Sequence, residues 1–346
     1  MDSELTMQSG YSLDQEHESS VDVELSVVIV TYNEEDRIQS CIESVFSACA
    51  NIPSFEIILI DSNSSDQTVD IALEYPITVA KIPDETLTTP SAGRYIGTKL
   101  ANAPAILFVD GDMVLSKEWL DAAVPLLEQP NVAGVDGQLN EPRSNAEIVE
   151  TDVIRGIALY DAHILNEVGG FDPYLQSMED IHLGFTVRDA GYTLLRLSSV
   201  AGYHPTRPTV TEPIRRWKNG YMEGTGQVVR RSLNNQQLLF QYFSRLRYQL
   251  FLIFWLGIGI FSLPFLPLFL IWSITSIIGA GLVATKLGVS DMVGFFFGKI
   301  ITIPGFIRGL LLTPKDADEY PLERVEQLKF GPIHQSESAH QFQVRQ

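Results

Sequence analysis

The feature that most constrains this chain of 346 residues is a long uncharged segment in its C-terminal third. Residues Leu250 to Ala284 include no charged side chain. One helix over these 35 residues would far exceed a bilayer core of about 30 Å, because a helix rises about 1.5 Å per residue. Pro264 and Pro267 stand where a turn between two helices belongs. The pattern therefore predicts two transmembrane helices within residues 247–285.

A third apolar stretch covers residues 288–312 and differs from the first two. It contains Lys299, Pro304 and Arg308, and charged side chains are costly at the bilayer centre but favourable at its surface. An interfacial helix is the expected structure here, and a third transmembrane helix is the alternative.

The charge of the chain changes sign just before this apolar region. Residues 25–200 hold 27 acidic and nine basic side chains, whereas residues 201–250 hold two acidic and eight basic ones. Basic residues beside a span favour the cytoplasmic side. We therefore expect basic juxtamembrane helices over residues 211–246 and a cytoplasmic domain before them. Two spans would return residues 313–346 to the cytoplasm as a tail, in a multi-pass protein of the cell membrane.

The overall charge bears on partners and on the source of the protein. Lys and Arg number 24 against 43 Asp and Glu, a net charge of −19, so no nucleic-acid partner is expected. The first 24 residues hold seven acids and no Lys or Arg, which predicts a disordered tail without a signal peptide. Arg outnumbers Lys sixteen to eight, and the strong self-repulsion favours a halophilic, archaeal source.

Three apolar runs, interrupted only by Ser26 and Glu56, lie in the domain before the basic segment (the front domain), and a polar residue follows each run. They are Leu25–Val30 before Thr31, Phe55–Ile60 before Asp61, and Ala105–Val109 before Asp110. Such runs are typical of parallel strands buried on both faces, and helical patterns lie between them. The expected fold over residues 25–210 is an open, mostly parallel α/β sheet with helices on both faces. In this architecture ligands bind beyond the carboxyl ends of the strands.

A pair of carboxylates follows the third run. Asp110 and Asp112 flank Gly111 on the loop that leaves a buried strand, where a divalent cation, Mg²⁺ or Mn²⁺, could bridge them to a diphosphate. Taken alone, this pattern is more often a solvated turn. No glycine-rich dinucleotide or P-loop motif is present in the sequence, so phosphates must be held differently.

Several motifs surround this pair in a fixed order. They are VVIVTYNE (Val27–Glu34), IILIDSNSSD (Ile57–Asp66), SAGRYIG (Ser91–Gly97), VGGFD (Val168–Asp172), MED (Met178–Asp180) and RDAGY (Arg188–Tyr192). Together they resemble family 2 glycosyltransferases of the GT-A fold over roughly residues 25–205. Tyr95 stands where the family usually has Asn, and His182 stands where an acidic residue is commoner.

The resemblance implies a site for a nucleoside diphosphate sugar, linked to UDP or GDP. Thr31, Glu34 and Asp61 would hold the nucleoside, and Arg94 would offset the charge of the diphosphate. Asp61 also fits a turn or helix N-cap, and Glu34 also fits the first turn of a helix, where acids are favoured in any case. Arg94 could equally be an ordinary surface arginine.

The resemblance also implies a metal site. Asp112 would ligate the cation, and Asp110 would contact it or the ribose. His204, after the last expected strand of the domain, is a weaker candidate ligand, with an unrelated structural role as the alternative.

On the acceptor side, the resemblance assigns Asp180 as the general base, with Glu179 beside it. The carboxylate would take the proton of the acceptor hydroxyl while that oxygen attacks the anomeric carbon opposite the diphosphate, so the reaction inverts the configuration. If the acceptor is already a phosphate, Asp180 would only orient it. A helix-start acid is the alternative.

Arg216 and Trp217, which follow Arg215, keep the last part of a motif found in processive members of the family, but Pro213 replaces its Gln. Polymer synthesis is therefore not claimed. These residues would meet a leaving diphosphate or a lipid phosphate, and plain anchoring at the membrane is the alternative.

The leading hypothesis is an inverting, metal-dependent transfer to a membrane-embedded acceptor at the cytoplasmic face. The acceptor would be a polyprenyl (dolichol-type) phosphate or a lipid-linked oligosaccharide. A glycosyltransferase for polysaccharide or glycolipid is the alternative among enzymes, and an inactive membrane scaffold is the alternative outside them. The sequence does not identify the sugar, and it leaves an oligomer open.

Overall fold

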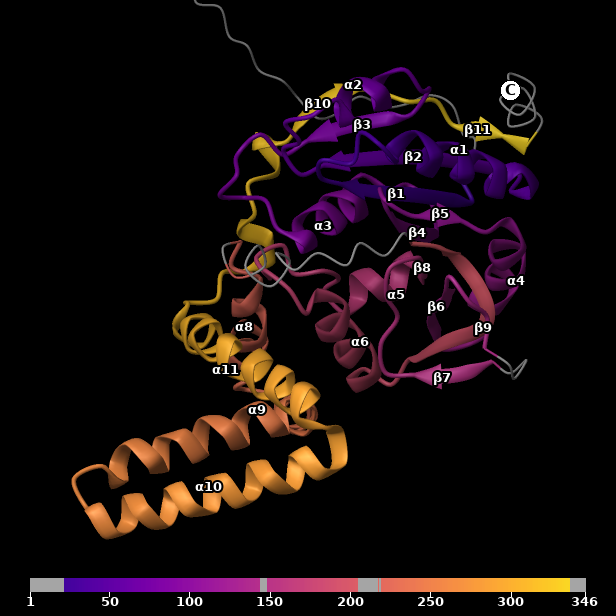
Figure 1. Ribbon diagram of the computed structural model, residues 1–346. Helices are drawn as coiled ribbons and strands as arrows, with labels where there is room; N and C mark the ends of the chain where they lie inside the picture. Colours follow the sequence, from indigo (N-terminus) through magenta and orange to yellow (C-terminus); the bar gives the residue numbers. More distant parts are fainter. Residues whose placement is uncertain (1–21, 144–147, 205–216, 218, 337–346) are drawn as a thin grey trace, which may run out of the picture.

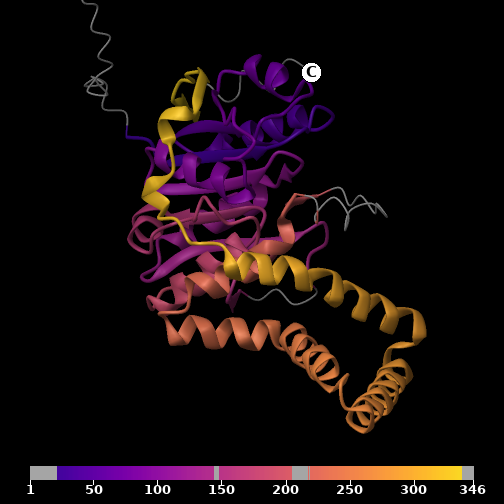
Figure 2. The ribbon, with the colours of Figure 1, turned by 90° about the vertical axis from the view of Figure 1, so that its left-hand side faces the viewer.

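The computed structural model describes residues 22–143, 148–204, 217 and 219–336, and it contains an α/β domain from which three long helices extend (Figure 1). A second view shows α9 leaving the domain and α11 returning to it (Figure 2). The predictions for residues 1–21 and for most of residues 205–218 lie outside the described part of the chain.

The centre of the domain is one mixed sheet with the order β10-β3-β2-β1-β4-β8-β6-β9-β5, to which β11 and β7 are added at β2 and β9. The strands are β1 (Leu25–Thr31), β2 (Ser54–Asp61), β3 (Thr78–Lys81), β4 (Ala105–Asp110), β5 (Val114–Leu115), β6 (Val132–Leu139), β7 (Val149–Thr151), β8 (Ala158–Asp161), β9 (Thr193–Tyr203), β10 (Glu326–Lys329) and β11 (His334–Gln335). The expected α/β fold is confirmed.

The sheet is less parallel than expected. β3, β2, β1 and β4 are parallel, as predicted for the three apolar runs. Beyond β4 the pairing changes, because β8 runs antiparallel to both β4 and β6. Strands β6 and β9 are again parallel to each other. The half of the sheet that contains β1, β2, β3 and β4 thus has the predicted topology, whereas the second half is mixed.

Helices cover both faces of the sheet and extend from it. They are α1 (Ile38–Ala48), α2 (Thr68–Leu73), α3 (Pro90–Leu100), α4 (Lys117–Leu127), α5 (Ala162–Glu167), α6 (Glu179–Asp189), α8 (Gly224–Arg231), α9 (Gln236–Ser262), α10 (Leu266–Leu287) and α11 (Val289–Leu311), with short 3₁₀ turns η1 (Cys49–Asn51), η2 (Tyr221–Glu223), η3 (Ala317–Glu319) and η4 (Leu322–Arg324).

Strand β1 shows how the core is divided. Val27 and Ile29 pack into the cluster that includes α1 and α4, whereas Val28 packs into the cluster that includes α3 and α6. All three side chains are fully buried, and each such burial contributes about 1.5–3 kcal/mol. A strand that is covered on both faces is apolar over most of its length, which is why the centre of β1 has no alternating pattern.

Helix α3 begins and packs for identifiable reasons. The Thr89 side chain accepts a hydrogen bond from the Ala92 N–H, and Pro90 occupies the first helical position. Gly97 allows the helix to approach β1, because a Cβ at this position would overlap the side chain of Val28. This close packing fixes the position of Arg94, which lies on the same helix.

The apolar C-terminal region forms three helices. α9 ends at Ser262 and α10 begins at Leu266, so the break falls where the prolines were expected to place it. α10 and α11 are long and apolar enough to cross a membrane. α10 has no buried residue, whereas Gly305, Phe306 and Gly309 in the second half of α11 are buried against the domain.

The chain after α11 returns to the domain. Strand β10 pairs antiparallel with β3, and β11 pairs antiparallel with β2 (Figure 1). Tyr320, which lies in the chain between α11 and β10, is buried, and its hydroxyl donates to the Leu87 carbonyl over 3.1 Å. Residues 313–336 are therefore part of the folded domain, although their sequence predicted only a tail.

Candidate active site

The carboxyl ends of β1 and β2 form the first part of the site. Thr31 and Asp61 are direct neighbours in the register of the two strands, and both are buried. Thr31 Oγ1 and Asp61 Oδ1 have no hydrogen-bond partner among the described residues. Buried polar atoms in native proteins are normally paired, so two unpaired oxygens at one strand edge indicate a ligand site.

Asp61 also has the turn role that was its alternative. Its Oδ2 accepts the Ser64 N–H over 2.8 Å, which leaves Oδ1 for another partner. Burial raises the pKa of Asp61 above its usual range, and the hydrogen bonds from Ser64 oppose this shift. The turn and the nucleoside role are therefore compatible, because they use different oxygens.

Two asparagines, to which the sequence motifs assigned no role, shape the loops beyond these strands. Asn33 and Asn63 both have left-handed backbones, with φ values of 54° and 68°. The Asn33 N–H donates to Ser64 Oγ over 2.8 Å, and Asn33 Oδ1 accepts the Ser65 N–H over 2.9 Å. Asn tolerates the left-handed conformation better than most residues. An Asn shortly after a predicted strand could therefore have indicated these two turns from the sequence.

Glu34 lies at the rim of the crevice. Its N–H donates to Thr68 Oγ1 over 2.8 Å, and its carboxylate lies 3.2 Å from Arg37 Nη1. Arg37 in turn lies 3.8 Å from Asp112. The carboxylate thus belongs to a chain of charges that leads to the predicted metal loop, and its contact with a nucleoside stays a prediction.

The predicted metal loop is held tightly against β1. The Gly111 N–H donates to the Val30 carbonyl over 2.9 Å, and a Cβ at Gly111 would lie 2.7 Å from Thr31 Oγ1. Any larger residue would push the loop away from Thr31 at the end of β1. The glycine between the two carboxylates therefore has a packing reason.

His204 joins this loop. Its Nε2 lies 3.1 Å from Asp112 Oδ2, although the two residues are far apart in the sequence. Within residues 22–143, 148–204, 217 and 219–336, no group of three or more His, Cys, Asp or Glu side chains forms a preorganised metal cluster. One carboxylate and one imidazole still fit a divalent cation that takes its remaining ligands from a diphosphate and water.

Arg94 connects the two sides of the site. It is only 6% exposed, and its Nη2 lies 2.7 Å from Asp110 Oδ1. The same guanidinium lies 3.5 Å from Glu179 Oε1 and 4.0 Å from Asp180 Oδ1. Arg94 is therefore not an ordinary surface arginine, because it lies among three carboxylates from two distant segments.

Glu179 and Asp180 begin helix α6 beside Arg94. Met178, directly before them, has a left-handed backbone with φ 69°, which is costly for this residue type and is common at functional sites. Burial raises the pKa of Asp180 to about 7; Arg94 opposes the shift, whereas Glu179 and Asp110 add to it. A carboxylate with a pKa near neutrality is suited to proton transfer.

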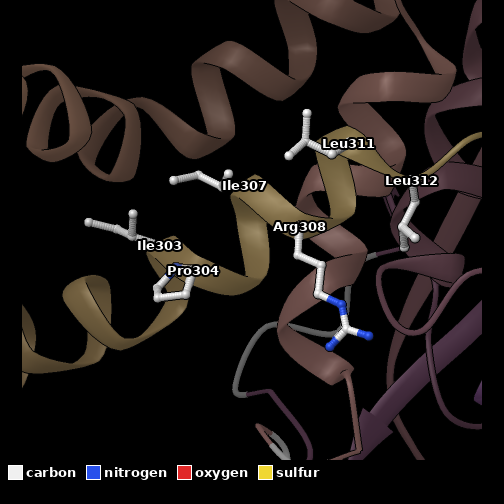
Figure 3. Close-up of a pocket in the computed structure, with 6 residues that line it drawn as sticks. All are labelled: Ile303, Pro304, Ile307, Arg308, Leu311 and Leu312. Atoms are coloured by element: carbon white, nitrogen blue, oxygen red, sulfur yellow. The ribbon is translucent and has the colours of Figure 1, made fainter.

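A small pocket opens directly beside Asp180. Its volume is about 170 Å³, and it is lined by Arg155, Tyr221, Thr225 and Thr302 in addition to Glu179 and Asp180. A larger apolar pocket of about 500 Å³ lies on α11, where Ile303, Ile307 and Leu311 project from one side of the helix (Figure 3). Thr302 and Ile303 are adjacent in the sequence, so α11 contributes to the walls of both pockets.

The basic segment is only partly described. Arg215 and Arg216 lie outside the described residues, and Trp217 is 52% exposed.

Tyr95 and His182, the two departures from the family pattern, have partners in the C-terminal part of the chain. His182 Nδ1 lies 2.8 Å from the Tyr242 hydroxyl of α9, and the ring of Tyr95 packs edge-on against Tyr320.

A mixed α/β sheet with a carboxylate pair after one strand and a buried acid beside it has the architecture of the GT-A fold. Residues 26–151 match the model of glycosyl transferase family 2, so this part of the chain is a domain of that type, and its glycosyltransferase relatives support the transferase assignment that the sequence predicted. The remainder of the chain lies outside that match.

Two curated relatives support this assignment. Glycosyltransferase AglE of Haloferax volcanii is 26% identical over 205 residues, which cover 53% of this chain and 67% of that protein. The poly(ribitol-phosphate) beta-glucosyltransferase of Bacillus spizizenii is 26% identical over 179 residues, or 46% of this chain but only 28% of that longer protein.

Two solved structures share the fold. The mannosyltransferase PcManGT from Pyrobaculum calidifontis, in complex with GDP-Man and Mn²⁺, has a TM-score of 0.53 at 18% identity and covers 84% of this chain and 88% of that one. S. aureus TarS 1-349 in complex with UDP-GlcNAc has a TM-score of 0.50 at 19% identity and covers 83% and 90%.

Proposed function

We propose that this protein transfers a sugar, with inversion, from a nucleoside diphosphate sugar to a membrane-embedded acceptor at the cytoplasmic face. The observation that carries the proposal is the position of Arg94 between Asp110 on the donor side and Glu179 and Asp180 on the acceptor side. A transferase must bring a donor and an acceptor together in one place. The relatives that bind UDP-GlcNAc and GDP-Man support the class of donor.

On the donor side, the unpaired oxygens of Thr31 and Asp61 would bind the nucleoside. Asp112 and His204, with Asp110 beside them, would hold a divalent cation, and that cation would neutralise the charge on the leaving diphosphate. Arg94 would keep Asp110 ionised and oriented, since burial alone raises the pKa of Asp110 and Arg94 opposes that shift.

On the acceptor side, Asp180 would take the proton from the acceptor hydroxyl as that oxygen attacks the sugar. Its raised pKa makes it a stronger base than a solvated carboxylate, so proton transfer to it is more favourable. Where the attacking group is a phosphate oxygen, no proton needs to leave, and Asp180 would orient the acceptor instead.

The proposed membrane topology rests on where the segment from α9 to α11 begins and ends. Leu238 and Tyr242 near the start of α9 pack in a cluster with α6, and the chain after α11 joins the sheet through β10. Both ends therefore lie on the side of the domain, so the number of complete membrane crossings between them is even. This supports two crossings rather than three, with the remaining helix along the surface.

The test is the release of nucleoside diphosphate by membranes that contain the full chain, given Mn²⁺ and a panel of UDP- and GDP-linked sugars. The wild type should release product, and Asp180→Asn should lose about a hundred-fold or more in rate. Asp70→Asn is the matched control, because Asp70 is an exposed acid on α2. Wild-type membranes that release nothing with any donor would reject the proposal.

A further inference from the structure

The pocket beside Asp180 is lined by the loop between β7 and β8 and by three helical segments. Glu179 and Asp180 come from the start of α6, Tyr221 and Thr225 come from η2 and α8, and Thr302 comes from α11. Because α11 is a candidate membrane helix, the pocket faces both the proposed base and the membrane-proximal part of the protein. An acceptor held in the membrane would reach Asp180 here.

The charge of this pocket is unfavourable to any acidic acceptor unless a cation is available. Glu179 and Asp180 both line it, and Arg94 behind them is already shared with Asp110. Arg94 is also buried, so an incoming group cannot easily reach it. A negatively charged acceptor that enters the pocket would therefore be repelled by Glu179 and Asp180 before it could reach Arg94.

Arg155 supplies a cation at the solvent-exposed side of the pocket. It lies on the loop between β7 and β8, lines the same pocket and is exposed. Its backbone N–H donates to Asp136 Oδ2 over 3.1 Å, which anchors the loop. In the part of the chain that the structure describes, its guanidinium makes no hydrogen bond and no ion pair, so its five N–H donors remain available.

A second arginine lies near enough to interact with it. Arg245 near the start of α9 has a lowered pKa, caused first by burial and then by the positive charge of Arg155. The two guanidinium groups repel each other, and the carboxylates of Asp136 and Asp180, which also interact with Arg155, offset part of this repulsion. Bound anions remove that repulsion, so the arrangement favours an anionic ligand.

We propose that Arg155 binds a negatively charged group of the acceptor in this pocket, and so restricts the enzyme to anionic acceptors. This inference rests on the proposed transfer function. A planar guanidinium binds phosphate and carboxylate through paired hydrogen bonds, so two sources of the charge fit. The first is the phosphate of a lipid phosphate, and the second is the carboxylate of an acidic sugar on a lipid-linked glycan.

The experiment measures the acceptor KM and kcat of the full chain in detergent, with Mn²⁺ and the donor that supports turnover. The variants are Arg155→Gln and Arg155→Lys, and Arg143→Gln is the matched control, since Arg143 is an exposed arginine that does not line the pocket. Donor binding and acceptor-independent donor hydrolysis are measured in the same preparations, because they report the donor side alone.

The acceptor probes distinguish the two sources. One is a short polyprenyl phosphate, and its neutral counterpart is the polyprenol. The other is a lipid-linked glycan that ends in a glucuronate, and its neutral counterpart is the methyl ester of that sugar. Arg155→Gln should raise the KM for the charged member of one pair about 10- to 100-fold, as expected for the loss of a hydrogen bond to a charged group. The KM of Arg155→Lys should lie between those of the wild type and Arg155→Gln.

Several results would overturn the inference. A KM for the charged acceptors that stays within about two-fold in Arg155→Gln would do so, as would equal use of the charged and neutral members by the wild type. A fall in kcat with an unchanged KM would indicate a structural role and would also reject it. Release of no nucleoside diphosphate by the wild type with any donor and acceptor is a different outcome, because it would reject the transfer function itself.

Discussion

Arg94 Nη2 lies 2.7 Å from Asp110 Oδ1 at the junction of the donor and acceptor sides of the site. The sequence assigned both residues to the donor, Arg94 as a charge for the diphosphate and Asp110 as part of the carboxylate pair. Their contact, together with Glu179 and Asp180 on the same guanidinium, makes Arg94 the link between the two halves. The first prediction follows from this position.

Arg94→Gln should lower the unfolding free energy by about 3–5 kcal/mol, because removing one partner leaves buried carboxylates without compensation. Activity should fall as well. The double variant Arg94→Gln, Asp110→Asn should recover part of the lost unfolding free energy, because the neutral Asn leaves no unpaired charge at position 110. It should recover no activity. Chemical denaturation and turnover of the same preparations would check this. Equal stability of the single and double variants would contradict it.

The second prediction concerns the metal. Asp112→Asn should abolish metal-dependent donor binding and leave the thermal unfolding midpoint nearly unchanged, because the side chain is 21% exposed and lies on a loop. His204→Ala should weaken the same binding less, since a carboxylate is the stronger ligand for Mg²⁺ or Mn²⁺. Titration calorimetry of donor with and without Mn²⁺ is the measurement. Unchanged affinity in Asp112→Asn would remove Asp112 from the metal site.

The third prediction is a pH profile. The pKa of Asp180 is about 7, raised by burial and by Glu179 and Asp110, and lowered by Arg94 and Arg155. Below this pH the carboxyl carries the proton and cannot act as a base, so kcat/KM for a hydroxyl acceptor should fall about ten-fold per pH unit. Arg155→Gln removes a positive charge and should move the midpoint to higher pH. A profile that is flat between about pH 5 and 8 would exclude Asp180 as the base.

The raised pKa of Asp180 also affects stability. Activity should rise with pH, whereas the contribution of Asp180 to stability should fall. Asp180 holds its proton up to about pH 7 in the folded protein but loses it near pH 4 when unfolded. The folded state therefore binds more protons in this range, and the contribution of Asp180 to the unfolding free energy decreases as the pH rises from about 4 to 7. Asp180→Asn should flatten this part of the stability curve, which denaturation at several pH values would show.

The sequence was informative where the chemistry is local. An apolar run followed by a polar residue marks the end of a buried strand, so the residue pattern alone predicts that Thr31, Asp61 and Asp110 share one sheet edge. Pairing between distant segments is not encoded in that way. β10 has the sequence EQLK, without the apolar pattern of a strand, and it forms because the edge of β3 is available.

Side-chain partners far apart in the chain were likewise beyond local patterns. Arg155 had no motif around it, and its position in the pocket depends on α6, α8 and α11 together. Tyr95 and His182 looked like isolated departures from the family pattern. Their partners, Tyr320 and Tyr242, belong to segments that follow the front domain, so these departures adapt the domain to its own C-terminal helices and strands.

The fourth prediction tests the high-salt setting. Residues 25–200 carry a net charge of −18, and repulsion among exposed carboxylates destabilises the compact state. At molar salt the Debye length is about 3 Å, compared with about 30 Å at 0.01 M, so the repulsion is largely screened. The full chain in detergent should unfold at a clearly higher temperature in molar potassium chloride than in dilute buffer. Equal midpoints would argue against a halophilic protein.

The last prediction concerns the contact between α11 and the acceptor side. A Cβ at Gly309 would overlap the Glu223 carbonyl oxygen, and a Cβ at Gly305 would overlap Met222. The η2 turn that they touch continues to the acceptor loop, because the Ser177 hydroxyl donates to the Tyr221 carbonyl over 2.7 Å. α11 therefore packs directly on the segment that forms one wall of the pocket.

Gly309→Leu should separate α11 from η2 and enlarge or misalign that wall, because neither backbone can move aside without losing its own hydrogen bonds. Acceptor turnover should fall by about ten-fold or more, whereas donor binding at the ends of β1 and β2, on which α11 does not pack, should persist. Gly298→Leu is the matched control on the same helix, since nothing lies within 4 Å of a Cβ there. Comparable acceptor turnover in the two variants would mean that α11 does not shape the acceptor site, and parallel loss of donor binding in Gly309→Leu would point to general unfolding instead.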